Sequence, residues 1–119
     1  MNPTYPLGDL SLSRLQQEQR AWVAHNFPDR EAYMPLLGAV EELGELSHAH
    51  LKHAQGIRGM TQEKYEELAA DAVADVVIYL ADYCSAVGLD LHAAVRDTWA
   101  QVKTRDWKAD PDGGGMGAT

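Results

Sequence analysis

The stretch that decides the fold is 38–48, GAVEELGELSH, in which three carboxylates fall within five residues. A helix has about 3.6 residues per turn, so Glu41, Glu42 and Glu45 project from roughly one side of it. Like charges at spacings of three or four residues destabilise a helix by about a few tenths of a kcal/mol per pair. The cluster is therefore either a solvated acidic face or a site that a bound cation bridges.

A second stretch, 71–80 or DAVADVVIYL, places Asp75 in an almost wholly apolar run. A helix this apolar is buried on most sides, and an isolated ionised carboxylate inside it is costly unless it is paired or bound to metal. Asp71 lies one turn earlier on the same face, so we expect two inward carboxylates from this helix. Together with the glutamates they predict an oxygen-lined site for Mg²⁺, with Mn²⁺ as a second possibility.

Length and charge narrow the class of protein. The 119 residues predict one helical domain, 1–109, followed by a flexible glycine-rich tail, 110–119. With 10 basic and 18 acidic residues the net charge is −8, which argues against duplex nucleic acid as a partner because such binding depends on neutralising phosphates. No signal peptide or membrane-length apolar run is present, so we expect no membrane contact and a cytoplasmic protein. The single Cys84 excludes an internal disulfide and predicts a buried, inert thiol.

Start and stop signals predict four helices and no strand. The first begins at a capping box, Ser13 to Gln16, and ends before Pro28, whereas the second has Pro35 in its first turn and ends at Gln55. The third runs from a Thr61 cap to Val87, and the fourth from an Asp90 cap to near Arg105. Short connections predict an all-α, antiparallel four-helix bundle. Its core is thin and its aromatic residues are many, so we expect a homodimer or homotetramer.

Over roughly 15–107 the chain resembles the MazG-like nucleoside triphosphate pyrophosphohydrolases of the all-α NTP pyrophosphatase superfamily. The resemblance rests on EELGEL at 41–46, DVVIYL at 75–80, GLDL at 88–91 and AV at 94–95. It implies metal-dependent hydrolysis of a ribo- or deoxyribonucleoside triphosphate between the α and β phosphates, giving the monophosphate and pyrophosphate. By position, Glu42, Glu45 and Asp75 match metal ligands, and Glu41 matches the acid that orients or deprotonates the attacking water. Such chemistry agrees with the residues, since metal ions neutralise phosphates and a nearby carboxylate can act as a base.

The chain departs from the family pattern on two helices. Ala72 stands where the family carries a glutamate, and Asp71 is the available substitute as a metal ligand. Thr98 and Val102 stand where many relatives carry a lysine and an asparagine that hold phosphates.

Other side chains are then the candidates for substrate contacts. Trp22 and Phe27 precede the acidic helix, where relatives place aromatic rings against the base, although core packing or a dimer interface explains them equally well. The candidate phosphate ligands, each of which can also be a plain surface charge, are Lys52, Arg58, Lys103 and Arg105.

Two alternative functions remain open at this point. Glu45 and His48 form a Glu-x-x-His half-motif of di-iron carboxylate bundles, but that fold needs the half-motif twice, and no histidine follows Asp71 or Asp75 at three residues. His48 could also touch substrate or metal in the pyrophosphohydrolase. The second alternative is a non-catalytic relative that binds a nucleotide or a partner protein, which agrees with the missing phosphate ligands but not with the full acidic set.

Overall fold

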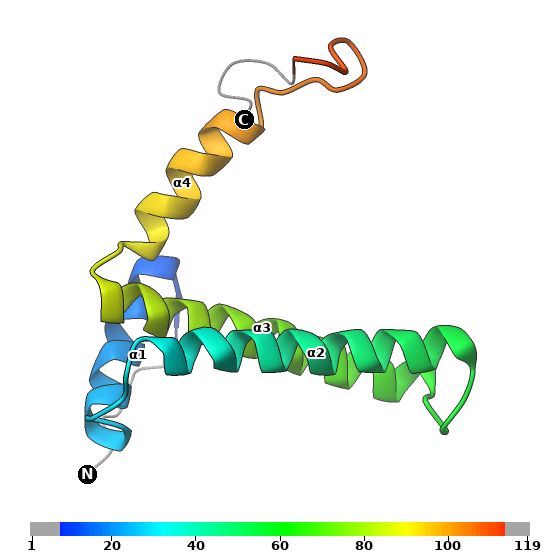
Figure 1. The fold of residues 1–119 in the computed structure, drawn as a ribbon, viewed down its shortest axis with the longest axis horizontal. Helices are drawn as coiled ribbons and strands as arrows, with labels where there is room; N and C mark the ends of the chain where they lie inside the picture. Colours follow the sequence, from blue (N-terminus) through cyan, green and yellow to red (C-terminus); the bar gives the residue numbers. More distant parts are fainter. Residues whose placement is uncertain (1–7, 114–119) are drawn as a thin grey trace.

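The structure is a computed structural model that describes residues 8–113, and four helices make up most of this part of the chain (Figure 1). The helices are α1 (Leu12–Asn26), α2 (Tyr33–Gln55), α3 (Gln62–Val87) and α4 (Leu91–Val102). Residues 8–113 contain no strand, so the prediction of an all-α fold is confirmed. Of the predicted tail, 110–113 form a turn in which the Gly113 N–H donates to Asp110 Oδ1 at 2.9 Å, and 114–119 lie outside the described residues.

Most helix ends lie where the sequence predicts them. Gly56 ends α2 in the left-handed region, with φ of 66°, and Gly88 ends α3 in the same way. Thr61 caps α3 by accepting a hydrogen bond from the Lys64 N–H at 3.2 Å, and Asp90 caps α4 through the Ala93 N–H at 2.9 Å. Short polar side chains and glycine therefore set these ends locally.

Two predicted ends are wrong. The cap of α1 is Ser11 instead of Ser13, because the Arg14 N–H donates to Ser11 Oγ at 3.1 Å. The helix begins earlier because Leu12 packs against the buried cluster of Ala81, Cys84 and Leu91. At the other end of the chain, α4 stops at Val102, short of Arg105.

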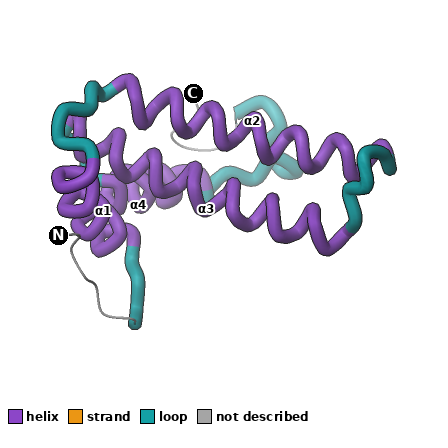
Figure 2. Tube along the Cα trace, turned by 90° about the horizontal axis from the view of Figure 1, so that it is seen from below, coloured by secondary structure: helices purple, strands orange, loops and turns teal. Residues whose placement is uncertain are grey.

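The long helices α2 and α3 form an antiparallel hairpin, and α1 packs across α3 at the end far from the hairpin loop (Figures 1 and 2). The chain then turns by 109° between α3 and α4, so α4 projects away from the hairpin. In the described chain α4 contacts α1 and α3 but not α2. The four helices therefore do not close into a bundle within one chain.

The core is small for a chain of this length. Ala39, Ala49 and Ala72 are buried between α2 and α3, and Ala81, Cys84 and Leu91 form the cluster at the base. Among the described residues no large side chain is fully buried. The radius of gyration is 17.8 Å, whereas a compact domain of this length has about 13.5 Å. Within 8–113 no single helix is long and apolar enough to cross a membrane, although the bent pair of α3 and α4 would be by length and composition alone.

Candidate functional site

The glutamates of α2 gather as the sequence predicts. Glu41, Glu42 and Glu45 each offer a carboxylate oxygen, and these three oxygens lie within 4.8 Å of one another. Glu41 and Glu45 are exposed, whereas Glu42 is half-buried. One turn of α2 thus places three carboxylate oxygens, the kind of ligand that hard divalent cations prefer, next to one another on one side of the helix.

Glu42 is the unusual member of this group. Burial raises the pKa of Glu42 above its ordinary value of 4.5, and the negative charges of Glu45, Asp75 and Glu41 raise the pKa further. Its Oε2 atom is buried and has no hydrogen-bond partner in the described structure. A buried, unpaired carboxylate oxygen among like charges is stabilised either by a proton or by a cation.

Asp75 meets Glu42 across the helix pair. Both residues line a cavity of about 230 Å³ between α1, α2 and α3, and Asp75 is half-buried, as the apolar run around it predicts. The predicted carboxylate of Asp75 thus shares this cavity with Glu42, whereas Glu41 and Glu45 are not among the lining residues.

Aromatic residues of α1 and of the segment after it line the same cavity. Trp22 and Phe27 form an edge-to-face pair with ring centroids 5.8 Å apart. Gln19, which no local sequence pattern marks, lies one turn before Trp22 and is only 8% exposed. Its Oε1 atom has no hydrogen-bond partner among the described residues. A lining of aromatic rings with one buried amide is the kind of surface that holds an apolar, hydrogen-bonding ring.

Tyr79 closes the cavity between the hairpin helices. A Cβ atom at Gly38 would lie 2.5 Å from Tyr79 Cε1, so the tyrosine ring occupies the space that the glycine leaves free. Burial, followed by the charges of Glu42 and Glu41, raises the pKa of Tyr79 above 10.0. The phenol therefore stays protonated at neutral pH and can donate a hydrogen bond into the acidic cavity.

An ion pair ties the loop between α1 and α2 to α3 at the edge of the cavity. Arg30 Nε and one terminal nitrogen both lie 2.6 Å from Asp82 Oδ1, and Asp82 is 5% exposed. The sequence alone gave no sign of this pair, because its members lie 52 residues apart.

The predicted burial of Asp71 is wrong. Asp71 is exposed and lies outside the three-carboxylate group, while its neighbour Ala72 is buried against α2. A shift of one position on a helix turns a side chain by about 100°, and this turn points Asp71 outward. His48 is also exposed and is not among the grouped ligands.

The basic candidates lie away from the carboxylates of the same chain. Lys52 is two turns beyond Glu45, where its Nζ donates to Gln55 Oε1 at 3.2 Å. Arg58 is exposed in the hairpin loop, with φ of 57°. Lys103 and Arg105 follow α4, which does not contact α2. Their predicted phosphate contacts stay predictions.

Comparison of the chain with family models, with curated proteins and with solved structures finds no match.

Proposed function

We propose that this chain is a metal-dependent nucleoside triphosphate pyrophosphohydrolase that releases a monophosphate and pyrophosphate. The observation that carries the proposal is one cavity on which Glu42 and Asp75 meet Trp22, Phe27 and a buried glutamine. The acidic end of this cavity suits a metal-bound triphosphate, and its aromatic end suits a nucleobase.

The residues suit Mg²⁺ or Mn²⁺. All three grouped ligands are carboxylates, which hard divalent cations prefer. Within residues 8–113, the buried Glu42 Oε2 has no hydrogen-bond partner. Glu42, Glu45 and Asp75 are the side chains that would hold the ion. When bound, the ion would neutralise phosphate charge and lower the pKa of a water molecule.

The chain's own residues have distinct parts in this reaction. Glu41 is exposed beside Glu42 and Glu45, which leaves its carboxylate free to accept the proton of an attacking water. The protonated Tyr79 phenol can donate a hydrogen bond to a phosphate oxygen at the same cavity. The rings of Trp22 and Phe27 would contact the base, and Gln19 would form a hydrogen bond with its edge.

Assembly is part of the proposal. We propose that the protein is a homodimer or homotetramer in which neighbouring copies complete the antiparallel bundle that one chain leaves open, and that it acts in the cytoplasm. Two basic candidates, Lys103 and Arg105, follow a helix that projects away from the acidic group of its own chain. Phosphate contacts from these two residues therefore require a second copy.

The distance between these basic residues and the acidic group of the same chain also agrees with an alternative function, nucleotide binding without cleavage. A protein that binds a nucleotide without cleaving it would need the cavity but not a complete set of phosphate ligands. The di-iron alternative has less support, because the grouped ligands are all glutamates and His48 is not among them.

The decisive experiment is a screen of canonical and damaged nucleoside triphosphates with Mg²⁺ or Mn²⁺, in which the products are resolved by chromatography. We expect monophosphate and pyrophosphate, with activity lost in EDTA. Release of inorganic phosphate, or a rate that EDTA leaves unchanged, contradicts the proposal. Binding without turnover of any triphosphate supports the non-catalytic alternative.

A matched pair of variants locates the activity. Glu45→Ala removes a grouped carboxylate, and we expect it to lower kcat by at least about 100-fold, in the range of lost transition-state electrostatics. Glu66→Ala removes an exposed glutamate on α3 that accepts a hydrogen bond from Gln62, and we expect the rate of this variant to stay within about twofold of wild type. Equal losses of kcat in the two variants would show that the activity does not depend on the group of three glutamates.

A further inference from the structure

Asp82 is a buried carboxylate on the wall of the cavity that Glu42 and Asp75 also line. It does not belong to the group of three glutamates. Burial of a charged group is costly unless the group is paired, and Asp82 is paired with Arg30. A carboxylate held in this way on a cavity wall is a hydrogen-bond acceptor for whatever occupies the cavity.

Arg30 contacts only one of the two carboxylate oxygens of Asp82. Its Nε and one terminal nitrogen both lie 2.6 Å from Asp82 Oδ1. Within residues 8–113, Asp82 Oδ2 has no hydrogen-bond partner. Two contacts on one oxygen fix the position of the carboxylate, and the second oxygen keeps its lone pairs for a bound molecule.

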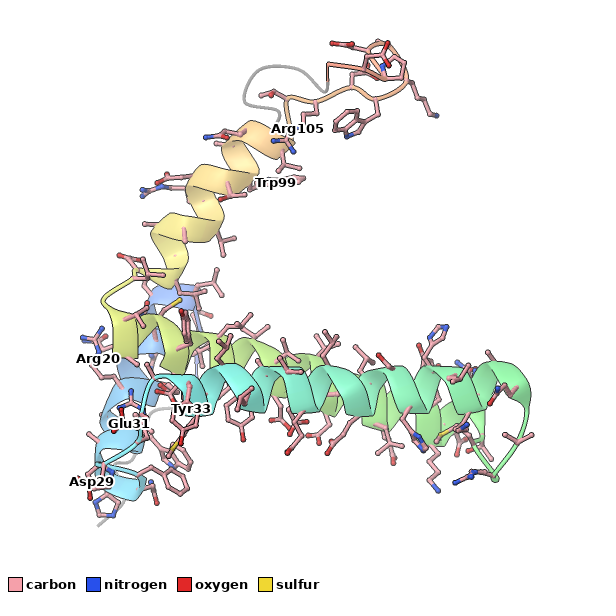
Figure 3. The ribbon with its side chains drawn as sticks, viewed as in Figure 1. Arg20, Asp29, Glu31, Tyr33, Trp99 and Arg105 are labelled. Atoms are coloured by element: carbon pink, nitrogen blue, oxygen red, sulfur yellow. The ribbon has the colours of Figure 1, made fainter. Side chains whose placement is uncertain are left out.

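The loop that carries Arg30 turns this residue inward, whereas the residues on either side of it stay outside. Asp29 and Glu31, which mark this loop between α1 and α2 in Figure 3, are both exposed. The Arg30 N–H donates to the Phe27 carbonyl at 3.3 Å, and the Arg30 side chain is half-buried. Arg30 therefore pairs with the acid on the cavity wall and not with the two acids next to it in the sequence.

Charge decides what kind of group Asp82 can receive. Three acidic residues line the cavity, Glu42, Asp75 and Asp82, and none of the described residues that line it is basic. Arg30 lines an adjoining cavity of about 210 Å³, which shares Asp82, Phe27 and Tyr79 with the first one. Because Arg30 offsets the charge of Asp82, this carboxylate can accept a hydrogen bond from an anionic ligand without repelling its phosphates.

Helical geometry separates Asp82 from the proposed metal ligands. Asp75 and Asp82 are seven residues apart on α3. Seven residues make nearly two turns, so the two side chains share one side of the helix and lie about 10 Å apart along its axis. Tyr79 lies between them in the sequence and lines the same cavity. Phosphates bound at Asp75 therefore leave Asp82 to the nucleoside half of the ligand.

The sugar is the part of the nucleoside that fits this position. In the proposed function the base contacts Trp22, Phe27 and Gln19, which belong to α1 and the residue after it. The sugar joins the base to the phosphates, so a base on the α1 side with phosphates at Asp75 brings the sugar to the remaining wall, which α3 provides. Sugar hydroxyls donate hydrogen bonds, and a carboxylate oxygen is a strong acceptor.

We propose that Asp82 Oδ2 accepts a hydrogen bond from a sugar hydroxyl of the substrate, and that Arg30 holds the carboxylate in position for this contact. The inference rests on the proposed function in one respect, since it takes the occupant of the cavity to be a nucleoside triphosphate. It makes Asp82 the residue that determines which sugar the site accepts. No bond has to be cleaved for this contact, so it applies equally to a protein that only binds nucleotides.

The first test measures binding to the wild-type, full-length chain by titration calorimetry with Mg²⁺. The probes are α,β-methylene triphosphates, which resist cleavage between the α and β phosphates. They carry one base and four sugars, namely ribose, 2′-deoxyribose, 3′-deoxyribose and 2′,3′-dideoxyribose. Loss of the hydroxyl that Asp82 binds should raise Kd by at least about 10-fold, the range of a hydrogen bond to a charged group. The two singly deoxygenated probes tell the 2′ hydroxyl from the 3′ hydroxyl.

This series separates failure of the inference from failure of the proposed function. Equal Kd values for all four sugars overturn the inference, and pyrophosphate release by the same preparation leaves the proposed function standing. Absence of binding by all four probes overturns both. A clear preference for one sugar without turnover of the natural triphosphates supports the inference and overturns only the catalytic part of the proposed function.

The second test assigns the sugar preference to Asp82. Asp82→Asn keeps an oxygen for Arg30 but replaces Oδ2 by an amide nitrogen, which does not accept a hydrogen bond. The ratio of Kd values with and without the hydroxyl should therefore fall to about threefold or less. Asp29→Asn, which removes an exposed carboxylate next to Arg30 in the sequence, should keep the wild-type ratio. Equal weakening of all four probes by Asp82→Asn, or a changed base preference with an unchanged sugar ratio, overturns the inference.

The part of Arg30 has its own variant. Arg30→Lys keeps the positive charge but offers Asp82 one nitrogen in place of two, so the carboxylate is held less firmly. We expect the sugar ratio of this variant to lie between those of the wild type and Asp82→Asn. A sugar ratio equal to that of the wild type overturns the positioning role of Arg30.

Discussion

Gly38 on α2 and Tyr79 on α3 touch so closely that a Cβ atom at position 38 would lie 2.5 Å from the tyrosine ring. The contact sets how far apart the two helices stand next to the carboxylate site, because Tyr79 and Glu42 line the same cavity. A Cβ atom at Gly44, less than two turns further along α2, would have no atom of a neighbouring element within 4 Å in the described part of the chain.

The first prediction uses these two glycines as a matched pair. Gly38→Ala forces the Tyr79 ring or the helices to move, and we expect it to lower the free energy of unfolding by about 1–3 kcal/mol, as overpacking does. Gly44→Ala meets no neighbour and gains helix propensity, so it should raise that free energy by about 0.5–1 kcal/mol. Urea titration followed by circular dichroism measures both. Equal effects of the two changes on the free energy of unfolding would mean that the Tyr79 ring moves aside without destabilising the protein.

The second prediction concerns Glu42 and pH. Because the folded-state pKa of Glu42 is raised above 4.5, the folded chain binds more protons than the unfolded chain between the two pKa values. The free energy of unfolding of the metal-free protein should therefore fall as pH rises through this window. Glu42→Gln should remove that part of the pH dependence, and Glu67→Gln, which removes an exposed charge on α3, should not. Thermal unfolding between pH 4 and pH 8 (about the range in which carboxyl groups with raised pKa titrate) measures the difference.

Metal binding gives a second readout of the same group. Protons and Mg²⁺ compete for the Glu42 carboxylate, so Mg²⁺ affinity should weaken as pH falls through the raised pKa. Calorimetric titration at several pH values should show proton release on binding. A Mg²⁺ affinity that is independent of pH across this range contradicts Glu42 as a ligand.

The third prediction separates the two aspartates of α3. Asp75 is half-buried on the cavity that Glu42 lines, whereas Asp71 is exposed and is not among the residues that line this cavity. Neither aspartate belongs to the group of three glutamates. Asp75→Asn should abolish the Mg²⁺ dependence of the rate, and Asp71→Asn should change it by less than about threefold, the usual scale for an exposed charge. Mg²⁺ titrations of both variants measure this. Equal losses would make Asp71 a metal ligand in spite of its exposure.

The fourth prediction concerns Gln19. An amide can offer a donor or an acceptor to the edge of a base, so its loss should change which base is preferred. Gln19→Leu keeps the volume and removes both groups, and we expect KM for the preferred triphosphate to rise by about 10-fold or more with kcat little changed. Gln17→Leu, at an exposed position on α1, is the control. An unchanged order of base preference would assign Gln19 a role in packing alone.

The fifth prediction tests the Arg30–Asp82 pair. Removing Arg30 leaves the carboxylate of Asp82 buried without its cation, so Arg30→Met should destabilise the protein by about 3–5 kcal/mol. The double variant Arg30→Met/Asp82→Asn also removes the unpaired charge of Asp82, so it should recover part of the lost stability. Urea titration of the single and double variants gives the coupling free energy between Arg30 and Asp82. Additive effects would show that the pair does not fix the α1–α2 loop.

The sequence by itself determined the features that depend on neighbours a few residues away. The spacing of Glu41, Glu42 and Glu45 places three carboxylates on one side of a helix wherever that helix packs. Thr61, Asp90 and the glycines after α2 and α3 set helix ends through hydrogen bonds and backbone angles within one turn. The apolar run around Asp75 predicted a carboxylate withdrawn from solvent, and Asp75 is half-buried. The run itself is less buried than predicted, since Val73 and Ile78 are exposed.

Only the tertiary structure decided the features that depend on distant contacts. The buried amide of Gln19, the pairing of Arg30 with Asp82 and the contact of Gly38 with Tyr79 join segments that no local pattern connects. The outward turn of Asp71 follows from which side of α3 packs against α2. The direction of α4 follows from Gln16, whose bonds to Leu89 and Leu91 reach across 73 and 75 residues. Helix periodicity says which residues share a side, but only the packing of one helix on another decides which side is inside.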